Sequence, residues 1–191
     1  MTEVTDIARS PAYHGTMARM HAQRNALFEE LAGVAAHRLW ERPAPKKWSP
    51  GEHLDHTRVL NASFRRLLST AWPVVSPWPA LLPGARRRLE RPYATDNDDA
   101  YQRPSLPSWM GFFWPPRRTP SRPASLAELE RALADEHGAI ARFYAGKPER
   151  LLGHVAVWDP AIRRLDLVQV LRVGIHHDLH HYTAVRRLLG R

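Results

Sequence analysis

The chain has 191 residues, no cysteine and a formal net charge of +9, with 43% hydrophobic and 25% charged residues. This composition is that of one globular domain, which we place over residues 1–191, and it excludes a disordered chain. The missing cysteines exclude disulfides, thiolate metal sites and a cysteine nucleophile, while the absence of a long apolar run excludes a membrane helix.

The first predicted element is an amphipathic helix from about Tyr13 to Trp40. Apolar residues recur there at three- and four-residue spacings, as on one face of a helix. Pro43 and Pro45 are expected to end it.

A second helix is predicted to begin after Ser49. Ser49 stands at the N-cap, Pro50 at the first helical position and Glu52 at the third, which is the pattern of a capping box. Apolar residues then follow at helical spacing, and Trp72 and Pro73 are expected to close the helix.

Residues 73–123 form a long Pro- and Trp-rich excursion between the second and third helices. Eleven of the seventeen prolines fall in this range, which excludes one long regular element. Aromatic residues such as Trp109 and Trp114 favour an ordered excursion over a linker, because linkers rarely carry so much apolar surface.

Two further helices are predicted in the remainder of the chain. Ser125 and Glu128 form a second capping box, and helical spacing continues to Gly146. A fourth helix is expected to start after Asp159 and Pro160 and to run through Leu188. Since no strand-like alternation is found, we predict an all-α fold, a four-helix bundle with one long excursion.

Histidine is unusually frequent, and four of the eleven histidines lie within six residues near the end of the last helix. His177 and His181 are four residues apart, as are His176 and His180, so either pair could share one metal ion across a helical turn. A third ligand is expected from the second helix. His56 is the better choice, because His53 is placed to pack on Trp48.

Two short motifs resemble those of the DinB-like (DinB/YfiT) superfamily. Residues 48–56, Trp-Ser-Pro-Gly-Glu-His-Leu-Asp-His, resemble the W-S-x-x-E-x-L-x-H start of that family's second helix. Residues 177–187 are similar to its H-x-x-x-H final helix, and Asp159-Pro160 resembles the dipeptide that usually opens that helix. The resemblance covers most of the chain except residues 73–123.

This resemblance implies a four-helix bundle with a divalent metal ion, zinc, nickel or manganese, held by His56, His177 and His181. Three imidazoles would leave coordination positions for water or substrate. The resemblance further implies a small-molecule substrate and a metal-dependent hydrolase or a low-molecular-weight-thiol S-transferase. Any thiol would be a cosubstrate, because the chain has no cysteine. A homodimer in the cytoplasm is also expected.

The sequence does not assign a catalytic base. Glu52 is better explained as a capping residue, and Asp178 points about 100° away from His177 around the helix, which favours a solvated or ion-paired role. A non-catalytic metal-binding stress-response or interaction bundle is the main alternative function. A basic nucleic-acid-binding protein is disfavoured, because the arginines are scattered and form no long run.

Overall fold

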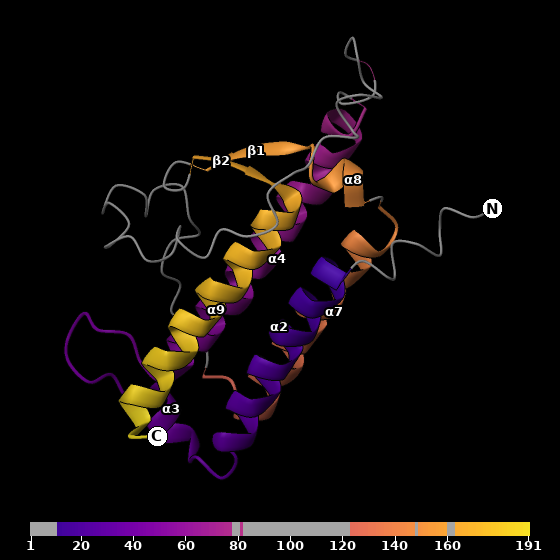
Figure 1. The fold of residues 1–191 in the computed structure, drawn as a ribbon. Coiled ribbons are helices and arrows are strands. Elements are labelled where there is room, and N and C mark those ends of the chain that lie inside the picture. The colour runs from indigo at the N-terminus through magenta and orange to yellow at the C-terminus, as the bar shows by residue number, and fades with distance from the viewer. Residues whose placement is uncertain (1–10, 78–80, 82–122, 148, 160–162) are drawn as a thin grey trace.

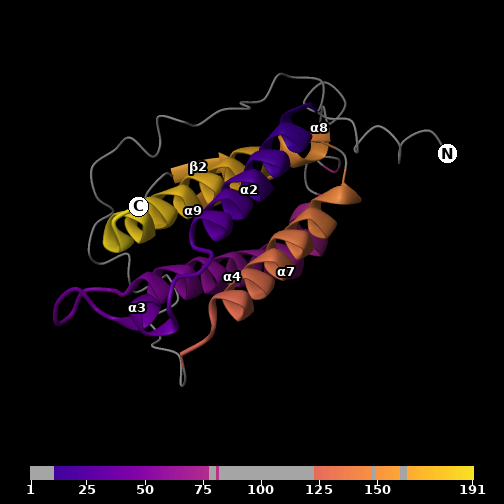
Figure 2. The same cartoon turned by 90° about the horizontal axis from the view of Figure 1, so that it is seen from below.

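The computed structural model describes residues 11–77, 81, 123–147, 149–159 and 163–191, and four long helices dominate them. These are α2 (Pro11–Glu30), α4 (Pro50–Val75), α7 (Leu126–Ala145) and α9 (Leu167–Leu189). Helices α2 and α4 each pack against both α7 and α9, so the four helices close a ring (Figures 1 and 2). The prediction of an all-α bundle is confirmed.

The direction of the helices explains the long connection between α4 and α7. These two helices run the same way along the bundle, whereas α4 and α9 run in opposite directions (Figure 1). The end of α4 and the start of α7 therefore lie at opposite ends of the bundle, which a short connection could not join. Most of the predicted excursion, residues 73–123, lies outside the described residues.

The predicted first helix is wrong in its extent, because the chain breaks after Glu30. Helix α2 ends there and a separate short helix, α3 (Ala36–Trp40), follows. Gly33 lies between them at φ +81°, a left-handed conformation that glycine adopts readily and that ends helices. The apolar spacing continues across this break because Leu31 and Leu39 both enter the core.

The predicted start of the last helix is also wrong. Helix α9 begins at Leu167, where the Asp166 side chain accepts from the Gln169 backbone N–H and the Gln169 side chain accepts from the Asp166 backbone N–H. Asp159 instead ends strand β1 (Ala156–Asp159), which pairs antiparallel with β2 (Arg163–Asp166). No strand was expected, because four residues are too short a run to show alternation clearly.

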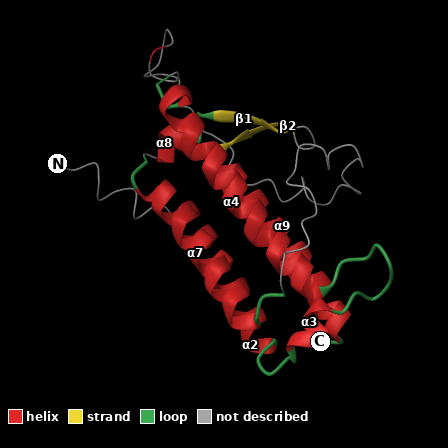
Figure 3. Cartoon of the chain, turned by 180° about the vertical axis from the view of Figure 1, so that it is seen from behind, coloured by secondary structure: helices red, strands yellow, loops and turns green. Residues whose placement is uncertain are grey.

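This hairpin and the short helix α8 (Glu149–Leu152) cover one end of the bundle (Figure 3). Leu152, Val155 and Leu165 are buried there and join the apolar core. At the opposite end α3 packs on α4, and the Trp40 indole donates to the Ala124 carbonyl oxygen at 2.8 Å.

Both predicted serine-capped helices begin as expected. The capping boxes of Ser49 with Glu52 and of Ser125 with Glu128 are present. The end of the second helix differs, because α4 continues through Pro73 to Val75. Proline is tolerated in this last turn, since the Ser69 carbonyl that loses its helical partner is on an exposed residue and can meet water.

The bundle interior has two apolar clusters, one toward the hairpin and one toward α3. Four of the buried polar side chains, one from each long helix, contact one another and form what we call the polar layer: Arg24 on α2, Asn61 on α4, His137 on α7 and Asp178 on α9. Among the described residues, no helix has the length and apolar character needed to cross a membrane.

Gly51 allows the close approach of α3 to α4, and this gives a stability test. A Cβ at Gly51 would lie 2.8 Å from two atoms of the Trp40 ring and 3.0 Å from the Leu39 carbonyl oxygen. We expect Gly51→Ala to lower the free energy of unfolding by about 1–3 kcal/mol, despite alanine's better helix propensity.

Gly174 is the matched control in α9. Among the described residues, a Cβ there would meet only Met20 Cε, at 3.8 Å, an ordinary contact. Gly174→Ala should therefore raise stability by up to about 1 kcal/mol in urea denaturation. Equal effects of the two substitutions would show that the Trp40 contact does not limit the packing of α3.

Candidate metal centre

The three histidines chosen from the sequence lie together. His56 comes from α4, and His177 and His181 come from the antiparallel helix α9 packed against it. One ring nitrogen of each residue lies within 4.8 Å of those of the other two, and His181 is buried while the other two are half-buried. This arrangement could hold one metal ion.

The structure also distinguishes the two pairs that spacing alone left open. His177 and His181 face α4, with ring centroids 5.4 and 4.8 Å from that of His56. His180 is exposed, and neither His176 nor His180 belongs to the cluster. The two pairs are distinguished by which face of α9 packs against α4.

The geometry of the cluster suits an imidazole-bound metal. The Nε2 atoms of His177 and His181 are 3.1 Å apart, close to the about 3.3 Å that tetrahedral ligands with Zn–N bonds near 2.0–2.1 Å would require. Burial, with the neighbouring imidazoles, lowers the pKa of His181 far below its usual value. Its ring is therefore neutral, the form that binds a metal.

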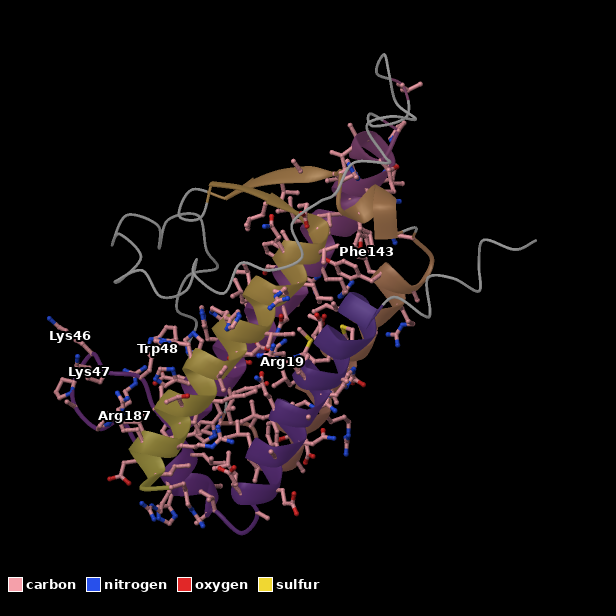
Figure 4. The ribbon with its side chains drawn as sticks, viewed as in Figure 1. Arg19, Lys46, Lys47, Trp48, Phe143 and Arg187 are labelled. Carbon is pink, nitrogen blue, oxygen red and sulfur yellow. The ribbon has the colours of Figure 1, made fainter. Side chains whose placement is uncertain are left out.

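Aromatic and imidazole rings surround His181. The Trp48 ring stacks on His181, with 5.8 Å between the ring centroids. Its centroid is also 4.7 Å from that of His56 and 5.1 Å from that of His53. The loop that carries Lys46, Lys47 and Trp48 runs beside the half of α9 that leads to Arg187 (Figure 4). This loop therefore shields the histidine cluster on one side.

His53 contacts the histidine cluster directly, in addition to its expected packing on Trp48. It does contact Trp48, but its Nδ1 atom also lies 2.8 Å from Nδ1 of His181. With Nε2 of His181 directed at His177, the remaining ring nitrogen of His181 is thus held by His53. Sequence reasoning missed this contact because it links residues 128 positions apart.

The polar layer lies directly behind His177. The Asp178 carboxylate accepts from the Asn61 amide at 3.2 Å and contacts Nε2 of His137 at 3.0 Å, while Nδ1 of His137 is 3.4 Å from the Arg24 guanidinium. Oδ1 of Asp178, the oxygen that His137 does not contact, lies 3.6 Å from Nδ1 of His177. This is an electrostatic contact beyond hydrogen-bond distance.

Asp178 is not solvated; its carboxylate is held inside the bundle by hydrogen bonds with Asn61 and His137. Its side chain is 1% exposed. Burial works to raise the pKa of the carboxyl, but the hydrogen bond from His137 and the nearby His177 imidazole outweigh it, so the pKa lies below its usual value. A buried carboxylate with these fixed partners is a poor general base.

Glu52 is a structural residue as the capping pattern predicted. It completes the capping box with Ser49 and also pairs with Arg42, whose Nε donates to Oε2 at 2.9 Å. Arg58, one turn after Asp55, pairs with that carboxylate at 2.7 Å. The aromatic residues of the excursion lie outside the described residues.

Comparison with known proteins agrees with this geometry. A model of the DinB superfamily matches residues 19–185, a range that contains all four long helices except the first residues of α2 and the last of α9. The chain therefore belongs to the DinB superfamily. Comparisons with curated proteins and with solved structures found no match.

The Arg42 and Glu52 pair gives a pH test. The hydrogen bond from Arg42, opposed by burial and aided by Ser49, lowers the pKa of Glu52 from 4.5 to about 2. Because the folded pKa is the lower one, the stabilisation is complete above pH 4.5 and disappears as the pH falls toward 2.

We expect the difference in unfolding free energy between wild type and Glu52→Gln to shrink over this pH range, as measured by urea denaturation. Arg42→Ala should give a similar profile, since it removes the largest cause of the shift. If the difference in unfolding free energy between wild type and Glu52→Gln stays constant with pH, the Arg42 pair does not lower the pKa of Glu52.

Proposed function

We propose that this chain binds one divalent metal ion through His56, His177 and His181 and uses it as a metal-dependent enzyme. The observation that carries the proposal is the convergence of three ring nitrogens from two helices within 4.8 Å, in a chain of the DinB superfamily. An all-imidazole set favours zinc or nickel over manganese, which prefers oxygen ligands.

A metal ion with three protein ligands supplies an open position that activates water or a bound thiolate. The chain's own residues support this chemistry by their placement. His181 presents a neutral ring, and the Trp48 ring packs against His56 and His181 on one side of the site.

Two reactions fit such a site, hydrolysis of an amide or similar bond and transfer of a low-molecular-weight thiol to an electrophile. Both need an open metal position, and they differ in the nucleophile. Because the chain has no cysteine, the thiol of the second reaction must come from a cosubstrate. Glu52 and Asp178 are held by other residues, so we assign neither of them as the base.

Metal analysis of protein prepared without a polyhistidine tag tests the site. We expect one zinc or nickel ion per chain in the wild type, and alanine at His56, His177 or His181 should weaken binding by more than the about 10- to 100-fold that loss of an outer partner causes. His180→Ala, on the same helix but outside the cluster, should bind as wild type.

Activity is tested with the zinc- and nickel-loaded protein, against amides and against thiols paired with electrophiles. We expect turnover that falls to background in His177→Ala and persists in His180→Ala. Metal binding with uniform inactivity would favour the non-catalytic bundle instead. Wild-type affinity in His177→Ala and His181→Ala would show that the site is wrong.

A further inference from the structure

His177 has one ring nitrogen directed at the cluster and one directed into the bundle. Its Nε2 is 3.1 Å from Nε2 of His181, whereas its Nδ1 is buried and has no hydrogen-bond partner among the described residues. An oxygen of the Asp178 carboxylate lies 3.6 Å from that nitrogen. Nδ1 therefore faces an anion across a short gap.

The hydrogen bonds of the polar layer fix the state of Asp178. Arginine can only donate, so the Arg24 guanidinium must donate to Nδ1 of His137, and the proton of that neutral imidazole must lie on Nε2. Nε2 then donates to one Asp178 oxygen at 3.0 Å. Asn61 donates to both oxygens at 3.2 Å, so the carboxylate is held directly from α4 and α7, and from α2 through His137.

We infer that Asp178 is the positioning residue of the metal site, and that Arg24, Asn61 and His137 hold its carboxylate toward His177. The anion favours the tautomer of His177 that carries its proton on Nδ1. That leaves the Nε2 lone pair for a metal ion, on the side of the ring that faces His181. Carboxylates that orient ligand histidines in this way raise metal affinity.

The two cluster histidines of α9, His177 and His181, therefore have different outer partners. Nδ1 of His181 meets the imidazole ring of His53 at 2.8 Å, whereas Nδ1 of His177 lies 3.6 Å from a carboxylate. A carboxylate accepts a proton partner more strongly than an imidazole does. Asp178 therefore faces only one of the two ligands, and its loss should affect His177 selectively.

Metal affinity provides the first test, and this inference rests on the proposed metal site. Asp178→Asn keeps the shape of the side chain and removes the charge. We expect it to bind zinc about 10- to 100-fold more weakly than wild type, at unchanged stoichiometry, in competition titrations. His137→Leu, which removes the donor to Asp178, should also weaken binding, and His137→Gln should restore most of it.

Leu133→Ala is the control for a general loss of packing. Leu133 is fully buried on α7 one turn before His137, but it contributes nothing to the polar layer. It should lower stability and leave zinc affinity unchanged at temperatures where all variants are folded. Wild-type affinity in folded Asp178→Asn and His137→Leu, or an equal loss in Leu133→Ala, would overturn the inference.

The protonation of ring nitrogens in the metal-free protein provides a second test that does not need metal. Long-range proton–nitrogen correlation spectra of ¹⁵N-labelled wild type should show the proton of His177 on Nδ1 and that of His137 on Nε2. In His137→Leu the His177 proton should distribute over both nitrogens. A wild-type His177 protonated on Nε2 would overturn the inference.

The two tests separate this inference from the proposed function. If the wild type binds neither zinc nor nickel, the proposed function fails, and the spectra alone decide whether Asp178 orients His177. If the wild type binds metal but the variants bind equally well, the inference alone fails. Should Asp178→Asn not fold, the two His137 variants and the wild-type spectrum carry the test.

Discussion

The buried negative charge of Asp178 is the constraint on which the middle of this bundle depends. A carboxylate removed from water is strongly unfavourable unless hydrogen bonds and opposite charge compensate it. Here Asn61 of α4 and His137 of α7 contact the carboxylate directly, and Arg24 of α2 supplies the compensating charge through His137. The helices must therefore align so that these side chains meet, with an apolar cluster on either side.

Most of the fold could be predicted, because its strongest determinants are local. Ser49 with Glu52 and Ser125 with Glu128 are capping boxes written in four residues, and both helices begin where expected. The three histidines could be chosen because helical spacing and the family motif agreed. The break at Gly33 could not be predicted, because the apolar spacing continues across it. The hairpin before Leu167 could not be predicted either, because its strands are too short to show alternation.

The polar layer could not be predicted from any single helix, although each helix carries part of the pattern. Arg24 follows Met20 by four residues and precedes Leu27 by three, so it occupies a place on an apolar face, and His137 does the same between Leu133 and Ile140. One such residue is ordinarily a surface side chain. The pattern has meaning only when all four helices are aligned, and that alignment is a tertiary property.

The order of the helices in the chain also sets when the histidine cluster can exist. His56 lies on α4, but its two partners and Asp178 all lie on α9, which follows the other helices. During synthesis the long helices α2, α4 and α7 can emerge and associate before any of those partners has been made, since chains form in order from the N-terminus. Assembly of the cluster is therefore a late event that reports a completed bundle, and His56 alone cannot direct it.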